Sequence, residues 1–371
     1  MQGLLSPLTG SRAEVSRVSL AEAIALGPAA WDVVLSSGPR SPFMSWEWHR
    51  AWAESAPLAE TAESTALLLR DVDGSLRALL PLRRERLRFR RVPVQALTWA
   101  IGDIGCPDEL DVAALPDAAV SDLAAALDAM PWQVLILNNL AEAAPNAARL
   151  ATALAERGHV VRRRPLWICP RLELPASWDA YLASLSAHRR QFVRRNERGL
   201  SRDHAVALAD YGSDRLDEGW SHLMRLHEQR WNDAGGGAFR DPRAQQLHRR
   251  FARELASRGR LWLSTLDVDG RPAAAWYGFV CDDTVYFYQG GRDPTWERES
   301  VGLVLLGMMI RRAIDRGYRA FSFLRGDDPY KKYWTSSRRQ THELVVFRTG
   351  WRGRWLRALD TVAGWQGGAS R

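Results

Sequence analysis

The sequence predicts an α/β (α+β) protein made of two similar domains in tandem, each a mixed, mostly antiparallel sheet flanked by helices. The chain has 371 residues, which is longer than a single hydrophobic core usually supports. Short alternating or aromatic stretches, typical of strands, are interspersed with segments of helical periodicity. One hairpin signal also occurs in both halves of the chain. We therefore expect a first domain at residues 1–168 and a second at residues 169–371.

The repeated signal is the tetrapeptide Asp-Val-Asp-Gly, which lies within Leu67–Leu82 and again within Leu261–Phe279. Asp-Gly between two apolar runs is a strong hairpin pattern. A further strand, a helix and another strand are expected after each hairpin, and this shared order favours a duplicated domain over a chance match. We expect the join near 165–175, where prolines bracket a change of pattern.

In the first half, Ser19 is placed to cap an amphipathic helix that runs to about Leu35. A second helix is expected over Trp46–Ser55. The alternating stretch 86–90 has arginines opposite Leu87 and Phe89, and we interpret it as a solvated edge strand rather than a nucleic-acid stripe. The other elements expected here are strands at 66–70, 76–82 and 134–137 and helices at 117–129 and 147–157.

The second half is expected to begin with helices at 177–185 and 186–196. Arg190 and Arg194 stand one turn apart on the latter, a basic face that by default is only solvated. Helices at 214–231 and 242–257 are separated by a glycine-rich turn, Gly235–Gly237. An aromatic strand, Tyr286–Gln289, breaks at Gly290-Gly291 and leads through a charged loop to a helix at 301–317. Strands at 320–324 and 338–348 complete the domain.

Composition limits the classes of protein to consider. The 51 Lys+Arg residues exceed the 43 Asp+Glu residues, and nearly all the basic residues are arginines, which suits anionic partners but also fits a coding bias. The three cysteines are far apart, so no zinc knuckle or disulfide framework is evident and no metal is expected. The chain has no apolar leader and no apolar run long enough to cross a bilayer, so we expect a cytoplasmic protein, soluble or at most peripheral.

The stretch Tyr286–Trp334 has the clearest succession of predicted elements in the sequence. It is expected to form a strand, a loop, a helix that starts at Ser300-Val301-Gly302, and a second strand. A helix that begins at a glycine-containing loop presents free backbone N–H groups to an anion. The stretch therefore predicts a site for a phosphorylated carrier.

Several short motifs, in order along the chain, carry a resemblance to a known family. The motifs are Phe43-x-Ser45-x-Glu47-Trp48, His188-Arg189-Arg190 with Arg194-Arg195, HEQRW at 227–231, Gly237-Ala238-Phe239, Asp293-Pro294, Ser300-x-Gly302 and Gly326-x-x-Pro329-Tyr330-Lys331-x-x-Trp334. With these motifs, the second half resembles the GNAT superfamily of acyl-CoA-dependent acyltransferases. The whole set is more closely similar to the acetyltransferase family named for cellulose biosynthesis (CelD/BcsL), relatives of FemAB-like tandem-GNAT proteins.

The resemblance implies two GNAT-like domains, of which the second binds acetyl-CoA or another acyl-CoA as co-substrate. A diphosphate needs several N–H donors and a helix N-terminus. A free backbone N–H on the aromatic strand would polarise the thioester carbonyl, and an amine would attack it directly. The implied cofactor-binding residues are Gln289, Gly290, Ser300, Val301, Gly302 and Leu303. The apolar pattern of the helix 301–314 is also explained, whether or not CoA binds, by a buried helix that packs on a sheet.

The sequence departs from the family pattern at two places that matter for the site. The usual cofactor loop has more than one glycine, whereas 298–303 contains only Gly302. Relatives commonly place aspartate where Ser322 stands. The loss of that carboxylate puts in doubt any acid or base role at this position.

The candidate catalytic residues are Asp328, Tyr330, Lys331 and His227. Asp328 and Lys331 are close enough in sequence to pair, and such a pair is more often structural than catalytic. A histidine on a helix is most often packed or solvated, so a catalytic role for His227 competes with that interpretation.

Three further residues near HEQRW are candidates for binding the acceptor. Arg230 suits an anionic group on the substrate, and Trp231 and Phe239 suit stacking on a sugar or an aromatic ring. In a chain with 17 tryptophans, however, an aromatic residue alone signifies little.

Three functions compete. The leading hypothesis is an N-acyltransferase that uses acyl-CoA and a small-molecule or surface-polysaccharide acceptor. The second is FemAB-like aminoacyl transfer from tRNA, which the basic helix favours and the lack of a heptad-rich coiled-coil arm disfavours. The third is a catalytically degenerate scaffold in polysaccharide assembly. We expect no DNA partner, and the leading hypothesis disfavours a tRNA partner. Peripheral association with a membrane, the acceptor's identity and the oligomeric state stay open.

Overall fold

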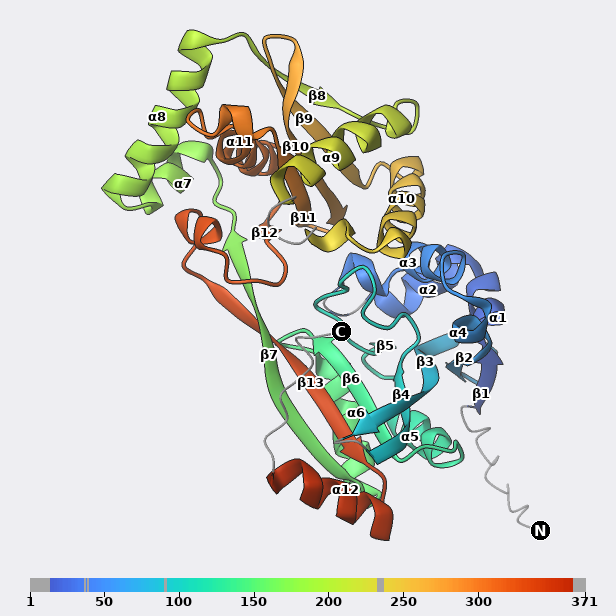
Figure 1. Ribbon diagram of the computed structural model, residues 1–371. Helices are drawn as coiled ribbons and strands as arrows, with labels where there is room; N and C mark the ends of the chain where they lie inside the picture. Colours follow the sequence, from blue (N-terminus) through green and yellow to red (C-terminus); the bar gives the residue numbers. More distant parts are fainter. Residues whose placement is uncertain (1–13, 37, 39, 90–91, 232–236, 363–371) are drawn as a thin grey trace, which may run out of the picture.

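The computed structural model describes residues 14–36, 38, 40–89, 92–231 and 237–362, and these form a mixed sheet that runs through both halves of the chain (Figure 1). The strand order is β1-β2-β3-β4-β6-β13-β7-β12-β11-β10-β9-β8, with β5 beside β3. Most neighbours are antiparallel, and the pairs β4/β6 and β11/β12 are parallel. The predicted α/β class with a mostly antiparallel sheet and flanking helices is confirmed.

The first half follows the predicted order of elements, with additions. Its strands and helices are β1 (Glu14–Ser19), α1 (Leu20–Ala25), α2 (Gly27–Leu35), α3 (Trp46–Ala53), α4 (Leu58–Ala62), β2 (Ser64–Arg70), β3 (Leu76–Phe89), β4 (Val92–Trp99), β5 (Ala113–Ala114), α5 (Val120–Asp128), β6 (Val134–Leu140), α6 (Pro145–Glu156) and β7 (Val160–Glu173). The sequence predicts no strand at the positions of β1, β4 and β7.

Ser19 caps a helix as predicted, through a capping box with Glu22. The expected single helix to Leu35 is wrong, because the chain divides into α1 and α2 at Gly27, whose φ of 80° lies in the left-handed region. The stretch 84–89 pairs with β4 on one side only and exposes Arg86 and Arg88, in agreement with the solvated edge that we expected; Arg90 lies outside the described residues.

The second half contains α7 (Trp178–Ser184), α8 (Ala187–Asp203), β8 (Val206–Asp210), α9 (Leu216–Trp231), α10 (Pro242–Ser257), β9 (Leu261–Val268), β10 (Arg271–Cys281), β11 (Thr284–Arg292), α11 (Val301–Asp315), β12 (Ala320–Ser322), β13 (Arg338–Phe347) and α12 (Trp351–Val362). Both Asp-Val-Asp-Gly hairpins are present, as β2/β3 and β9/β10. Each is followed by a strand, a helix and a parallel strand, as the repeat predicts. The expected turn at Gly235-Gly236 lies outside the described residues.

The two halves exchange their long strands. β7 pairs with β12 of the second half, whereas β13 pairs with β6 of the first half, and β7 and β13 pair with each other (Figure 1). The expected join at 165–175 is therefore not a linker but part of one strand, and β13 does not simply complete the second domain. Pro165 is tolerated because it lies where the β7/β13 register shifts, near Gln340 and His342. The division at residue 168 stays a prediction.

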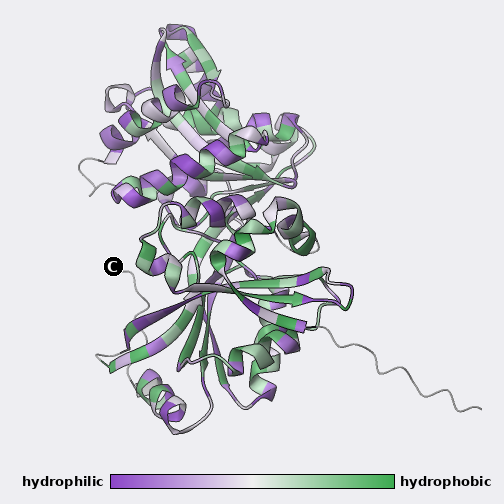
Figure 2. Cartoon of the chain, turned by 90° about the vertical axis from the view of Figure 1, so that its right-hand side faces the viewer, coloured by the Kyte–Doolittle hydropathy of each residue, from purple (hydrophilic) through white to green (hydrophobic). Residues whose placement is uncertain are grey.

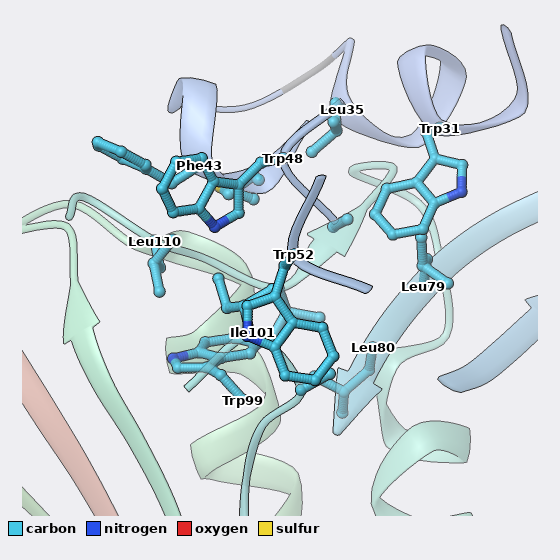
Figure 3. Packing of buried hydrophobic residues seen from close by; sticks show 14 of the residues in the cluster. Trp31, Leu35, Phe43, Trp48, Trp52, Leu79, Leu80, Trp99, Ile101 and Leu110 are labelled. Carbon is cyan, nitrogen blue, oxygen red and sulfur yellow. The ribbon is translucent and has the colours of Figure 1, made fainter. Parts of the chain in front are cut away.

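The helices cover both faces of the sheet. In the second half, α9 and α10 pack on the face turned toward the first half, and α7, α8 and α11 pack on the other face. Tryptophans and leucines of the first half fill the main core, as Figure 3 shows for Trp31, Trp48 and Trp52. Figure 2 shows hydrophobic residues concentrated in the strands and hydrophilic ones along the outer helices. None of the helices in the described ranges is long and apolar enough to span a membrane.

The predicted break of the aromatic strand at Gly290-Gly291 is wrong, because β11 continues through both glycines to Arg292. These glycines instead allow close packing. A β-carbon on Gly291 would lie 2.3 Å from the backbone nitrogen of His227, so the missing side chain lets α9 lie directly on β11.

We expect Gly291→Ala to lower the free energy of unfolding by about 3 kcal/mol, because the added methyl group meets backbone atoms of α9 rather than a flexible side chain. Urea unfolding measures the change. The matched control is Gly199→Ala in α8, where a β-carbon meets nothing within 4 Å, and we expect it to leave stability unchanged or slightly raised. Equal effects of the two substitutions would contradict this packing argument.

Candidate functional site

The candidate site lies where β11 and β12 separate. The two strands pair in parallel only between Thr284–Tyr286 and Ala320–Ser322. Beyond this point Tyr288 forms a bulge in β11, because Tyr277 of β10 lies opposite Gln289 and the next residue, Gly278, lies opposite Phe287. A bulge leaves one residue without a direct partner, and here that residue lies two positions before the glycine at which we expected the strand to break.

A cavity of about 130 Å³ occupies this separation. It brings together seven of the predicted site residues: Gln289, Gly290, Arg230, Trp231, Asp328, Tyr330 and Lys331. Its other lining residues are Cys106, Asp108, Ala238, Phe287, Tyr288, Phe323, Leu324 and Arg325. The predicted residues come from three segments far apart in sequence, so their meeting is a property of the fold.

Lys331 is buried and fully engaged. Its ammonium group donates to the carbonyl oxygens of Arg325 at 2.8 Å and Gly326 at 3.1 Å, and it lies 3.2 Å from the Asp328 carboxylate. Leu324 and Gly326 have positive φ angles of 54° and 108°. Lys331 therefore holds a strained turn in place. Burial lowers its pKa, and the nearby Asp328 carboxylate opposes that shift.

Asp328 and Tyr330 face the cavity with different chemistry. The Asp328 side chain is 46% exposed, so it is the accessible carboxylate of the predicted group. Burial raises the pKa of Tyr330 to about 12, with Arg230 opposing the rise, so the phenol is protonated at neutral pH and can act as a hydrogen-bond donor toward a ligand. The Arg230 guanidinium lies over the rings of both Trp231 and Tyr330, at 4.9 and 5.6 Å from their centroids, and its Nη1 donates to the Gly290 carbonyl.

His227 and Phe239 lie behind the cavity wall. His227 is 3% exposed, and burial lowers its pKa to about 4, with Arg230 adding to the effect, so the imidazole is neutral. Its ring packs 5.0 Å from that of Phe239, which is itself buried. The Nε atoms of His227 and Trp231 have no hydrogen-bond partner among the described residues. These are orphaned polar groups next to the cavity, of the kind that a bound ligand satisfies.

The remaining predicted cofactor residues form a separate group at the start of α11. Ser300 has φ 55° and its side chain makes no cap hydrogen bond, and Val301 and Gly302 occupy the first turn, where backbone N–H groups have no carbonyl of the helix to donate to. A β-carbon on Gly302 would lie 3.4 Å from the Arg292 side chain, so a guanidinium stem lies beside this turn. The donors and the charge fit a diphosphate.

The sequence reading missed the contribution of the first half. The loop 100–112 crosses to the second half and forms one wall of the cavity with Cys106 and Asp108. Asp108 is 1% exposed and accepts from Arg325 twice, from Nε at 2.8 Å and from the backbone nitrogen at 3.0 Å. Arg325 also donates to the Pro107 carbonyl at 2.7 Å and lies 3.2 Å from Asp103.

This ion pair is shielded from water. Burial raises the pKa of Asp108, and Arg325 opposes that rise. Burial alone would lower the pKa of Arg325, but Asp108 and Asp103 are so close that its pKa is raised. The only sign of this pair in the sequence is the cluster of Gly, Pro and acidic residues in the loop, which does not reveal a partner more than 200 positions away.

The same loop places a carboxylate beside Ser322, where the family pattern has aspartate. Glu109 Oε1 lies 3.5 Å from the Ser322 hydroxyl, and burial raises the pKa of Glu109 to about 7, partly offset by Arg171. Ser322 is fully buried and its hydroxyl also accepts from the Leu324 backbone nitrogen at 3.3 Å. A titratable acid is thus present near position 322, although the second half does not supply it.

The chemistry open to the cavity follows from the side chains that line it. Among the residues with described positions, no group of three His, Cys, Asp or Glu side chains is arranged to hold a metal ion. The cavity combines an accessible carboxylate, a protonated phenol, two guanidinium groups and aromatic walls. Such a set can orient a polar ligand and accept or donate a proton.

We expect Arg325→Met to lower the free energy of unfolding by about 3–5 kcal/mol, because it leaves the Asp108 carboxylate buried without its cation. Adding Asp108→Leu in the same chain should recover much of the loss. Urea unfolding of the wild type, of each single variant and of the double variant measures the coupling between the two side chains. Arg319→Met, at an arginine whose side chain is 82% exposed, serves as the control and should change stability by less than about 1 kcal/mol. A loss at Arg325 no larger than at Arg319 would rule out the buried pair as a stabilising contact.

Comparison with known proteins agrees with this geometry. Residues 187–332 match the family model described as an acetyltransferase (GNAT) domain. The crystal structure of FemX has a TM-score of 0.56 at 11% identity, covering 94% of this chain and 99% of that chain. The C-terminal domain (DUF2156) of a putative lysylphosphatidylglycerol synthetase from Agrobacterium fabrum has a TM-score of 0.54 at 11% identity, covering 94% and 100%. Identities this low show the fold alone.

One curated relative has a different name. Ribosomal RNA small subunit methyltransferase B of Pseudomonas putida is 31% identical over 140 residues, or 37% of this chain, and the match spans 27% of that protein. A match over so small a share of that protein gives no ground for assigning its activity to this chain.

Membership of the CelD/BcsL family stays a prediction. The second half of the chain contains a GNAT acetyltransferase domain, which supports an acyltransferase.

Proposed function

We propose that the protein is an acyl-CoA-dependent N-acyltransferase that transfers an acyl group, in the simplest case acetyl, to an amine. The observation that carries this proposal is the separation of β11 from β12 at the Tyr288 bulge, with a cavity between them lined by the predicted residues. The match of residues 187–332 to a GNAT domain supports it. The cavity then holds the reacting atoms, and the wall built by loop 100–112 belongs to the acceptor side.

The acyl donor would lie along β11 with its diphosphate at the start of α11. Val301 and Gly302 supply first-turn N–H groups there, whereas the N–H of Leu303 already donates to the Ser300 carbonyl at 2.9 Å. The positive end of the helix dipole also favours an anion. The pantetheine arm would then approach the Tyr288 bulge, where backbone N–H groups of β11 not used by β12 polarise the thioester carbonyl. These assignments follow from the chemistry of the donor, since acyl-CoA is a substrate of the reaction.

The transfer itself needs few groups. The amine nitrogen forms a bond to the thioester carbon, the carbon–sulfur bond breaks, and the amine loses a proton. Asp328 is the accessible carboxylate in the cavity and is placed to take that proton directly or through a water molecule. Tyr330, protonated at neutral pH, is placed to donate to the leaving CoA sulfur. Lys331 supports Asp328 and the strained turn that carries it.

The acceptor is proposed to be a small molecule with an anionic or sugar-like portion. Arg230 keeps its guanidinium between two aromatic rings and remains available to an anionic group, while the Trp231 indole nitrogen lacks a partner among the described residues. A surface-polysaccharide precursor is the acceptor that the CelD/BcsL resemblance implies. A panel of amino sugars, polyamines and peptides in a thiol-release assay distinguishes these acceptors.

We expect Asp328→Asn to lower kcat for CoA release by about a hundredfold, because the proton acceptor is lost while the shape is kept. The adjacent Asp327→Asn is the matched control: Asp327 pairs with Lys332 and Arg338 on the surface and should leave kcat nearly unchanged. Calorimetry with acetyl-CoA and longer acyl-CoAs tests the donor. Absence of binding for every chain length would remove the proposal, and binding without turnover by the wild type on any acceptor would favour a degenerate scaffold.

A second function, aminoacyl transfer from tRNA, is favoured by one surface. Helix α8 exposes Arg194, Arg195 and Arg198, and no ion pair is seen for them in the described part of the chain. The similar folds of FemX and of the putative lysylphosphatidylglycerol synthetase are consistent with it. A steep fall of tRNA affinity with salt that is flattened by Arg194→Gln with Arg198→Gln would support this function. CoA binding without tRNA affinity would count against it.

A further inference from the structure

Helix α12 places two large aromatic side chains in water. Trp351 is 69% exposed and Trp355 is 46% exposed, and they lie one turn apart on the outward side of the helix. No other tryptophan in the described part of the chain is exposed to a comparable degree. A soluble chain gains by covering such a pair, so the exposure calls for a ligand or a surface.

The outward aromatic strip is flanked by positive charge on both sides. In helical projection Arg352 lies on one side of the two tryptophans and Arg354 on the other, and both arginines are exposed. The Arg352 guanidinium lies 5.1 Å from the centroid of the Trp351 ring, so charge and aromatic surface are presented together. The outward face from 351 to 360 carries no acidic residue.

The acidic residue of this helix is turned inward. Asp360 is 3% exposed and pairs with Arg162, at 2.7 Å, and with Arg164, both on β7. Leu356 is also buried and packs in a small apolar cluster with Val345 and Phe347 of β13. The inward face is therefore fixed to the sheet by an ion pair and by apolar contacts, and the outward face is left as a rigid strip of tryptophan bordered by arginine.

We propose that α12 is a docking surface for the face of an anionic phospholipid membrane. Tryptophan prefers the interface between headgroups and acyl chains, where its ring is buried and its N–H stays wet. Arginines on either side of an apolar strip contact lipid phosphates, as in helices that lie in the plane of a membrane. A lipid surface is the occupant that meets the aromatic strip and both flanking charges at once, because it extends beyond the strip on each side.

The position of α12 suits this role. The helix lies at the β7 end that begins at Val160, whereas the cavity lies near the other end, where β7 meets β12 (Figure 1). A strand of 14 residues spans about 45 Å. Docking through α12 would therefore hold the protein at the membrane and leave the cavity open to the solvent. The inference is independent of which acyl donor the cavity uses.

The test is co-sedimentation of the full chain with vesicles. One set contains phosphatidylcholine alone, and the other contains an equal mixture of phosphatidylcholine and phosphatidylglycerol. We expect binding to the mixed vesicles, a marked fall of that binding at high salt, and little binding to phosphatidylcholine alone. Trp351→Ser with Trp355→Ser, and separately Arg352→Gln with Arg354→Gln, should each weaken binding to the mixed vesicles by about tenfold or more.

Two control variants remove an exposed apolar side chain or two exposed arginines from surfaces other than α12. Leu58→Ser removes a side chain that is 88% exposed on α4, and Arg215→Gln with Arg249→Gln removes the same charge from another exposed surface. Both controls should bind as the wild type does, and circular dichroism should show that all variants are folded. Wild-type chain that does not bind the mixed vesicles, or tryptophan variants that bind equally well, would overturn the proposal. Sedimentation velocity in which the tryptophan variants only abolish a dimer would assign α12 to a second copy instead.

Discussion

The buried ion pair between Asp108 and Arg325 joins the two halves at the point where the candidate site is formed. Arg325 lies three residues after the end of β12. Its guanidinium donates to three acceptors of the first-half loop, on Asp103, Pro107 and Asp108, and its backbone nitrogen donates to the second carboxylate oxygen of Asp108. If the Arg325 guanidinium moved away, the Asp108 carboxylate would remain buried without its cation, and the free-energy cost of that unpaired buried charge is large. The strained turn 324–326, and with it the cavity edge, is held in one shape from both sides, by Asp108 and by Lys331.

The exchange of long strands makes this contact permanent. Because β13 lies between β6 and β7, and β7 lies between β13 and β12, neither half can leave the other without breaking main-chain hydrogen bonds. Domain motion is a common way to open a site between two units. Here the shared sheet opposes such motion, so access to the cavity depends on loops and side chains more than on separation of the halves.

The features predicted correctly from the sequence are those that depend on residues close to one another in the chain. The Asp-Val-Asp-Gly hairpins, the Ser19 cap and helix α10 depend on residues within a few positions of one another, and they appear where their patterns predict. The strand β7 was overlooked because Pro165 and Pro170 are typical of loops, and only the distant partner β13 provides the register shift that tolerates the first of them. Gly290 and Gly291 suggest a break from sequence alone, because a sequence does not reveal that a helix packs against Gly291.

The two copies of the repeated unit, a hairpin followed by a strand, a helix and a parallel strand, have different roles. The region between β4 and α5 corresponds to the loop that leads into α11, but it contains Asp103, Asp108, Glu109 and Asp111. One of these carboxylates, Asp111, is used within the first half, where it accepts from the backbone nitrogens of Asn146 and Ala147, at 3.2 and 2.7 Å, at the N-terminus of α6. Such a loop repels an anionic carrier and attracts a cation, which Arg325 provides. The first copy therefore acts on the site of the second, by closing its wall, and we expect no acyl donor of its own there.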